Sequence, residues 1–280
     1  FYEQKNGYDS LSLEGREAMD AYCEGYKRYL DESRTERECV RNAIELAEAE
    51  GFTEYVPGMA LKTGDKVYYS NRGKALLLAV MGSEPMSAGA VVTAAHVDSP
   101  RLDLKQLPLY EDNELAFFKT HYYGGIKKYQ WTAIPLEIHG AVALKSGEVI
   151  DVVIGRDSGD PQLMVSDLLP HLAGEQMAKK LGEAIKAESM NILVGSAPYD
   201  DDGKDRVKLA VMSILNSQYG ITEEDLVSSE LYAVPAFDVR DIGLDRSLIG
   251  GYGHDDRVCA YAELKALFDL EGAPRRTAVC

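Results

Sequence analysis

The spacing of apolar residues changes twice along this 280-residue chain, near residue 105 and again near residue 230. Up to the first change, apolar residues recur at helical spacing over 11–30 and 34–50. Ser33 precedes the second pattern and Glu36 follows three residues later, which is the spacing of a helix capping box. Apolar runs typical of strands follow at 66–70, 75–81 and 88–95. Two helices followed by strands predict a mixed α/β layer.

Between the two changes, short strand-like runs separated by turn residues dominate. The predicted strands lie at 114–120, 131–138, 141–144, 148–154 and 163–165, and helices are predicted at 207–217 and 222–227. After residue 230 the α/β pattern returns, with a strand at 231–237 and a helix at 259–268. The sequence therefore predicts an α/β domain made of residues 1–105 and 231–280, interrupted by a strand-rich, β-barrel-like domain of residues 106–230.

Composition argues against several classes of function. The chain has 30 Lys and Arg against 46 Asp and Glu, a net charge of −16, so we expect no nucleic-acid partner. Its longest apolar runs fall well short of the roughly 20 residues of a membrane helix, and the N-terminal segment lacks the features of a signal peptide. The four cysteines form no C-x-x-C pair, which indicates reduced, mostly buried thiols. We expect a cytoplasmic protein without a membrane partner.

The segment 91–100, VVTAAHVDSP, places a histidine where an apolar run ends. His96 and Asp98 have a spacing that lets the carboxylate orient the imidazole from behind, as a metal-bound histidine requires. Sites in open α/β sheets are usually built at the carboxyl ends of strands. The alternative is a strand-end histidine that makes only a local hydrogen bond, and the His-x-Asp pattern by itself favours that alternative.

The segment 250–257, GGYGHDDR, places two adjacent acids between a glycine-rich turn and a helix. The charges of Asp255 and Asp256 repel each other unless a cation lies nearby. One aspartate can bridge two metal ions about 3.5–4 Å apart, a common arrangement in aminopeptidases. The alternative is an acidic cap at the start of the following helix. His121, His139 and His254 are expected to be turn, strand or core histidines.

Together these segments resemble one family. AAHVDSPRLDLK, HYYGGIKKYQW, SDLLPHLA and AVPAFDVRDIGLDRSLIGGYGHDDRVCAY, in this order, are similar to segments of the aspartyl aminopeptidase family of dinuclear zinc enzymes. The resemblance runs from about residue 7 to the last residue. It implies a zinc-peptidase-like mixed sheet flanked by helices, and a dimerisation role for the strand-rich domain. It also implies peptide substrates and homodimers that assemble into a dodecamer.

The resemblance implies roles for individual residues. His96 is similar to the imidazole ligand of the first zinc, and Asp98 to the carboxylate that supports it. Asp255 is similar to the aspartate that bridges both zincs, and a cis peptide bond follows that residue in related enzymes. His171 matches a family region near the neighbouring subunit's active site, which implies a substrate or interface role, with simple packing as the alternative.

The rest of the family's site lies beyond the position of Cys280. It comprises a Glu–Glu pair that supplies the general base and a ligand, then a later Asp and His. We therefore expect a C-terminally truncated chain that is inactive by itself. The predicted function is removal of the N-terminal residue of peptides, with Asp and Glu as candidate residues. The alternatives are a neutral-residue aminopeptidase, another amide hydrolase of the same fold, and a non-catalytic assembly subunit.

Overall fold

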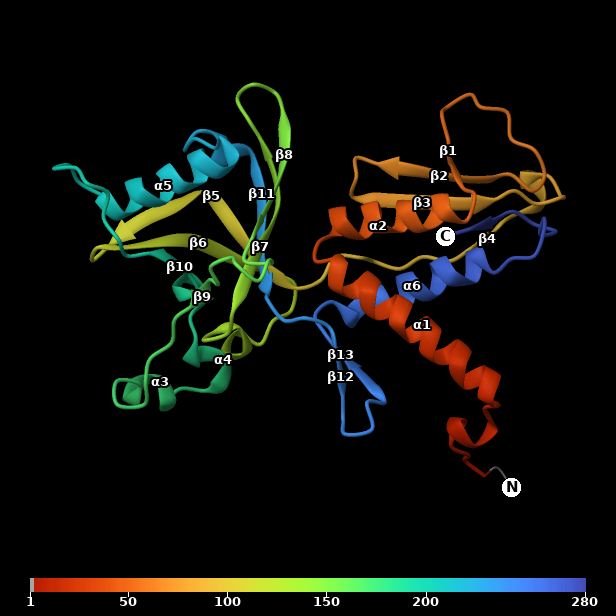
Figure 1. Cartoon of the computed structure of the whole chain (residues 1–280), viewed down its shortest axis with the longest axis horizontal. Coiled ribbons are helices and arrows are strands. Elements are labelled where there is room, and N and C mark those ends of the chain that lie inside the picture. The colour runs from red at the N-terminus through yellow and green to blue at the C-terminus, as the bar shows by residue number, and fades with distance from the viewer. Residues whose placement is uncertain (1–2) are drawn as a thin grey trace. The chain divides into compact units, whose positions relative to one another are not determined.

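The computed structural model describes residues 3–280, which form two compact units. Unit 1 combines the described residues up to Asp98 with Asp238–Cys280, and unit 2 is Ser99–Phe237 (Figure 1). The divisions thus fall at 98/99 and 237/238, whereas the sequence pattern placed them at 105/106 and 230/231. They lie further out because the first strand of unit 2 already begins at Arg101 and its last strand extends to Pro235.

Unit 1 is a mixed sheet with three long helices. Its helices are α1 (Leu13–Glu32), α2 (Glu36–Ala49) and α6 (His254–Phe268). Its strands are β1 (Thr53–Glu54), β2 (Lys66–Asn71), β3 (Ala75–Val80), β4 (Val91–Val92), β12 (Arg240–Ile242), β13 (Leu248–Gly250) and β14 (Ala278–Val279). The sheet order is β1-β2-β3-β14-β4. Strand β3 is antiparallel to both of its neighbours, β2 and β14, whereas β1 is parallel to β2 and β4 is parallel to β14. Strand β14 thus joins β4 to the β2–β3 hairpin.

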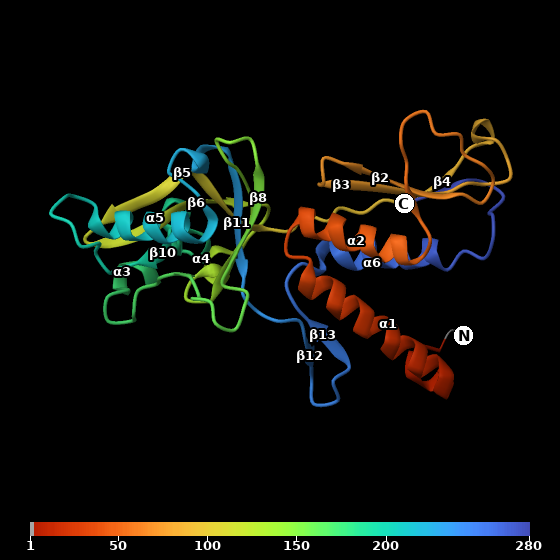
Figure 2. The same cartoon turned by 45° about the horizontal axis from the view of Figure 1, so that its top comes forward.

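The core of unit 1 lies between this sheet and the helices. In Figures 1 and 2, α1, α2 and α6 lie on the same side of the sheet. Alternate residues of β3 explain this: Leu78 is buried among the helices, while its neighbour Leu77 is exposed. Aromatic side chains from α1 and α6 meet in the core, with the rings of Tyr29 and Tyr261 at 5.4 Å. These contacts fix α6, whose first residues form part of the candidate site.

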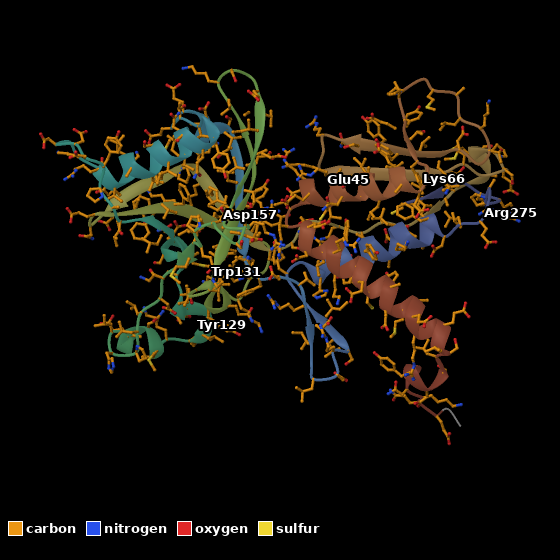
Figure 3. The ribbon with its side chains drawn as sticks, in the orientation of Figure 1. Glu45, Lys66, Tyr129, Trp131, Asp157 and Arg275 are labelled. Atoms are coloured by element: carbon orange, nitrogen blue, oxygen red, sulfur yellow. The ribbon has the colours of Figure 1, made fainter. Side chains whose placement is uncertain are left out.

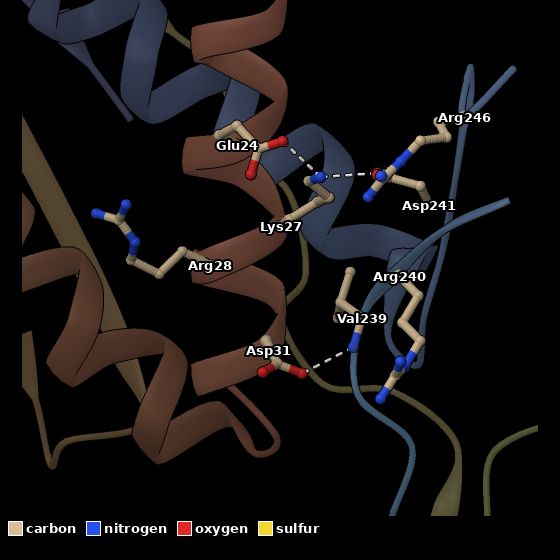
Figure 4. A pocket seen from close by; sticks show the side chains of 8 residues that line it. All are labelled: Glu24, Lys27, Arg28, Asp31, Val239, Arg240, Asp241 and Arg246. Carbon is tan, nitrogen blue, oxygen red and sulfur yellow. Dashed lines mark hydrogen bonds and ion pairs between the residues drawn. The ribbon is translucent and has the colours of Figure 1, made fainter.

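A small hairpin, β12–β13, is attached to α1 by polar contacts (Figure 4). Lys27 donates to Asp241 Oδ1 at 2.7 Å, and Val239 N donates to Asp31 Oδ1 at 2.9 Å. Arg246 also pairs with Asp241. Helix and hairpin enclose a polar cavity of about 540 Å³ in which Lys27 and Arg246 are both paired with Asp241. The hairpin leads directly into the turn before α6.

Unit 2 is a seven-stranded antiparallel sheet with one long helix. Its strands are β5 (Arg101–Asp112), β6 (Leu115–Tyr123), β7 (Leu136–Ala143), β8 (Val149–Ile154), β9 (Met164–Val165), β10 (Ile192–Gly195) and β11 (Ser229–Pro235). Its helices are α3 (Gly174–Met177), α4 (Leu181–Ala184) and α5 (Arg206–Tyr219). The sheet order is β8-β7-β11-β5-β6-β10-β9.

The unit 2 sheet curls back on itself. Leu163, just before edge strand β9, exchanges two backbone hydrogen bonds with Leu136 at the start of β7. The only tryptophan of the chain, Trp131, is buried within this unit (Figure 3). Gly140 lets β7 continue past β11, because a Cβ at this position would lie 1.8 Å from the carbonyl oxygen of Glu230. The predictions of a mixed α/β fold and of a barrel-like, strand-rich segment are confirmed.

Several local predictions were wrong. The cap of α2 is Thr35, paired with Glu38, because the Ser33 hydroxyl instead accepts a hydrogen bond from Asn42. The helix predicted at 222–227 is only a 3-10 turn, since the Asp225 carboxylate accepts hydrogen bonds from the Thr222 amide and hydroxyl. In place of the predicted strands at 131–138 and 141–144 there is the single strand β7, which begins only at Leu136, and the run at 88–95 forms only the two-residue strand β4.

The cysteines are all free, but they are not mostly buried. Cys39 is buried, Cys23 and Cys280 are partly exposed, and Cys259 is exposed. Burial raises the pKa of Cys39 to about 11, so this thiol stays protonated at neutral pH. Across residues 3–280, no helix has both the length and the apolar character needed to cross a membrane.

Candidate metal centre

His96 lies in an extended segment that follows β4. The Thr93 amide still donates to the carbonyl oxygen of Val279, which holds the start of this segment against β14. Beyond it the chain leaves the sheet, and the His96 side chain is half-exposed at 52%. The predicted strand-end histidine therefore lies at the edge of the unit 1 sheet, where a ligand can reach it.

Asp98 contacts His96 from behind, at the spacing expected from the sequence. His96 Nδ1 lies 3.0 Å from the backbone oxygen of Asp98 and 3.4 Å from its carboxylate Oδ1. Both groups accept hydrogen bonds, so they favour the tautomer with a proton on Nδ1. This arrangement leaves Nε2 directed away from Asp98.

Asp255 faces the other nitrogen of the same ring. Its Oδ1 lies 3.1 Å from His96 Nε2, although the two residues are 159 positions apart. The Asp255 side chain is 92% exposed. The Asp255–Asp256 peptide bond is cis, as the resemblance implied. Gly253 holds the N-cap position of α6, with no side-chain hydrogen bond that caps the helix.

Opposing influences act on the pKa of the His96 imidazole. Partial burial is the largest single influence and lowers the pKa of its imidazole. The hydrogen bond to the Asp98 backbone and the charges of Asp98, Asp256 and Asp255 act in the opposite direction, and the net result is a raised pKa. The surroundings therefore stabilise a positive charge at this position, whether a proton or a metal ion carries it.

The chemistry of these donors fits part of a zinc site. Two ligand atoms bound to one tetrahedral zinc at about 2.0–2.1 Å lie about 3.3 Å apart, which is close to the His96–Asp255 distance. Imidazole and carboxylate ligands also suit cobalt and manganese. However, residues 3–280 contain no group of three or more His, Cys, Asp or Glu side chains placed to hold a metal. The described residues thus bring together one imidazole nitrogen and one carboxylate oxygen, with the Asp98 carboxylate behind the ring.

The other histidines lie elsewhere. His254 precedes Asp255, but its Nδ1 contacts the Tyr26 hydroxyl at 2.8 Å, and burial raises the pKa of Tyr26 to about 12. His139 is buried in β7, 3.3 Å from Glu137, and His121 stacks on Tyr122. His171 lies in an exposed turn of unit 2, in neither a helix nor a strand.

Sequence reasoning missed one residue of this region, Arg257. Its side chain is fully buried, and its Nε donates to the carbonyl oxygen of Val97, between His96 and Asp98, at 3.0 Å. The sequence did contain a sign that Arg257 is buried. Arg257 occupies the apolar stripe of α6 that continues with Ala260, Tyr261 and Leu264 at helical spacing, where a charged residue is unusual.

Comparison with known proteins gives consistent matches. A family model described as aminopeptidase I zinc metalloprotease (M18) matches residues 29–278. A relative from Clostridium acetobutylicum, described as "Probable M18 family aminopeptidase 1", is 47% identical over 98% of this chain and 60% of its own length. The crystal structure of an M18 family aminopeptidase from Thermotoga maritima aligns with a TM-score of 0.93 and 41% identity, covering all of this chain and 60% of that one.

A second solved structure, aminopeptidase I from Clostridium acetobutylicum, aligns with a TM-score of 0.90 and 44% identity over the whole chain and 62% of its own length. The chain therefore spans about 60% of the length of the curated relatives that it matches. The similarity covers both units, including the segments that carry His96 and Asp255.

Proposed function

Because the chain belongs to the M18 family of zinc metalloprotease aminopeptidases, we propose that the protein containing it removes N-terminal residues from peptides in a metal-dependent reaction. The observation that carries the proposal is the meeting of His96 and Asp255 at 3.1 Å from two distant segments. This pair, with a carboxylate behind the imidazole, is a donor arrangement typical of metallohydrolases.

In this proposal, each residue has a defined task. His96 binds metal through Nε2, and Asp98 holds the imidazole in the tautomer that leaves Nε2 free to do so. Asp255 would supply a carboxylate ligand to the same site, and the resemblance implies that the complete site holds two zincs. Metal held by these residues would supply Lewis-acid polarisation of the scissile carbonyl and a lower pKa for a bound water. The exposure of both ligands supports access by a substrate.

The remaining ligands and the general-base glutamate are proposed to come from sequence outside these 280 residues. Two observations support this: the described residues contain no group of three or more His, Cys, Asp or Glu side chains placed to hold a metal, and the relatives extend well beyond the matched region. The 280-residue chain alone is then expected to bind zinc weakly and to be inactive. Metal analysis tests this expectation directly, because two tightly bound zincs per 280-residue chain would contradict it.

The activity is tested with the longest natural protein that contains this chain. Hydrolysis of Asp-, Glu- and Leu-p-nitroanilide is measured with and without a chelator. We expect chelator-sensitive release of p-nitroaniline, and the ratio of rates decides between acidic and neutral N-terminal residues. His96→Ala and Asp255→Asn should abolish the activity, while Asp157→Asn, an exposed aspartate of unit 2 (Figure 3), should not.

Inactivity of the wild-type protein with every metal tested would favour a non-catalytic assembly subunit. Cleavage of simple amides without any requirement for a free N-terminus would instead favour another amide hydrolase of the same fold. Both outcomes would overturn the proposed aminopeptidase activity.

We also propose that unit 2 mediates homodimer formation, with dimers assembling into a dodecamer, and that His171 lies at a subunit interface or near a substrate. Exposed apolar side chains around His171 support this, because patches of this kind often mark protein–protein contacts. Their exposed fractions are 53% for Leu168, 52% for Leu169, 68% for Leu172, 72% for Met177 and 65% for Leu181.

A further inference from the structure

Arg257 is a fully buried charge whose hydrogen bonds all go to main-chain oxygens. Its Nε donates to Val97 O at 3.0 Å, and its Nη2 donates to Arg34 O at 3.1 Å. No carboxylate pairs with this guanidinium within residues 3–280, and its Nη1 has no hydrogen-bond partner there. The residue is therefore not one half of an ion pair.

The guanidinium also packs against the turn that leads to Asp255. Gly253 has a φ of 94°, and a Cβ at this position would lie 2.2 Å from Arg257 Nη1. The centre of the Tyr252 ring lies 5.3 Å from the guanidinium carbon, within the range of a cation–π contact. The absence of a side chain at Gly253 thus makes room for the arginine.

One side chain therefore contacts three segments of unit 1. These are the loop that carries His96 and Asp98, the α1–α2 corner at Arg34, and the turn that carries Asp255. Cys39 adds a weaker contact from α2, with its sulfur 3.7 Å from the same Val97 oxygen. The corner itself is rigid, because Glu38 Oε2 accepts hydrogen bonds from the amides of Arg34 and Thr35 at 2.8 Å.

We propose that Arg257 is a positioning residue that sets the distance between His96 and Asp255 by fixing the His96 loop and the turn before α6 to the α1–α2 corner. The inference rests on the proposed metal site. Burying a charge without an ionic partner is costly, so an apolar side chain of similar size would serve packing alone at least as well. The planar fork of arginine, by contrast, directs donors on two separate nitrogens at two oxygens in a fixed geometry, which the single nitrogen of lysine does not reproduce.

The test measures metal affinity in the longest natural protein that contains this chain. Zinc and cobalt dissociation constants are determined by competition with a chelator, together with the visible spectrum of the cobalt form. The variants are Arg257→Met, which removes both hydrogen bonds, and Arg257→Lys, which keeps the charge but replaces the fork with a single nitrogen. Lys265→Met serves as the matched control, because Lys265 lies on the same helix, where its ammonium lies over the Phe268 ring.

We expect Arg257→Met to raise the metal dissociation constant about 10- to 100-fold, as observed when groups that orient metal ligands are removed. The metal dissociation constant of Arg257→Lys should lie between those of Arg257→Met and the wild type, and its cobalt spectrum should be altered. Lys265→Met should have the dissociation constant and the spectrum of the wild type. In the metal-free proteins, hydrogen exchange of residues 96–98 should speed up in both Arg257 variants. If Arg257→Met does not fold, Arg257→Lys carries the test.

Unchanged metal affinity and an unchanged cobalt spectrum in folded Arg257 variants would overturn the inference, even if their melting temperature falls, because the arginine would then serve stability alone. That outcome would leave the proposed metal site intact. A wild-type protein that binds no metal would overturn the proposed site together with this inference.

Discussion

His96 belongs to a loop and Asp255 to the first turn of α6, and the 3.1 Å between them depends on the backbone of both segments. The spacing within one short segment predicted the contact between Asp98 and His96, while the roles of His96 and Asp255 as metal ligands were implied only by the family resemblance and stay a proposal. Arg257 and Gly253 could not be predicted in the same way. Their importance comes from contacts with Val97 and Arg34, about 160 and 220 positions away, and a single sequence does not reveal such distant contacts.

Substitution of Gly253 provides a prediction at this scale. Gly253→Ala should lose about 1–2 kcal/mol of unfolding free energy from its left-handed backbone conformation and should also weaken metal binding, because the new Cβ displaces the Arg257 guanidinium. Gly58→Ala is the matched control, since Gly58 has the same φ of 94° and no atom within 4 Å of its Cβ position. Urea unfolding measures the free energy of unfolding, and competition with a chelator measures the metal affinity. Equal metal affinities in the two variants would contradict the prediction.

At the scale of elements, apolar periodicity predicted the long helices and the β2–β3 hairpin correctly. It missed strand β5 because Lys105, Gln106 and Pro108 interrupt the apolar alternation, and the strand accommodates them with a change of register between Leu104 and Leu109. It also gave too much weight to Thr222 as a helix start. The Thr222 amide and hydroxyl instead donate hydrogen bonds to the Asp225 carboxylate. These local hydrogen bonds compete with those of a helix, so no α-helix forms.

The attachment of the β12–β13 hairpin to α1 should depend on pH. Hydrogen bonds from Lys27, and then from Arg246, lower the pKa of Asp241. A carboxyl group whose folded pKa is lowered stabilises the folded state above its unfolded pKa of about 3.9, and this stabilisation disappears as the pH falls through the lower, folded value. Asp241→Asn should therefore reduce the urea midpoint at pH 7 but not at a pH below the folded pKa.

Asp245→Asn is the control for that measurement, because Asp245 lies in the same hairpin and is exposed. Its midpoint should stay close to that of the wild type at both pH values. A difference between Asp241→Asn and the wild type that persists undiminished in acid would exclude the proposed ionic attachment.

At the scale of the whole molecule, the curled sheet of unit 2 and the α/β layer of unit 1 are both accounted for by the sequence pattern. Assembly is a property of the complete protein, and this chain spans about 60% of its relatives. The proposal that unit 2 mediates dimer formation therefore needs a direct test. The exposed segment around His171 offers one, because Leu172 and Met177 are 68% and 72% exposed.

Replacing both Leu172 and Met177 with Lys should reduce the molar mass of the longest natural protein in solution, because two charges would be buried at an apolar contact. Light scattering coupled to size-exclusion chromatography measures this mass. Val149→Lys, at a 64% exposed position on β8 of the same unit, should leave the mass unchanged. An oligomer of wild-type mass in the double variant would place the interface elsewhere.

The most direct test of the proposed site is a crystal structure of the longest natural protein grown with zinc, with anomalous data collected at the zinc edge. We expect a zinc peak within about 2.0–2.2 Å of both His96 Nε2 and an Asp255 carboxylate oxygen. We also expect a second peak on the other side of that carboxylate. Zinc bound at a site that includes neither residue would contradict the account.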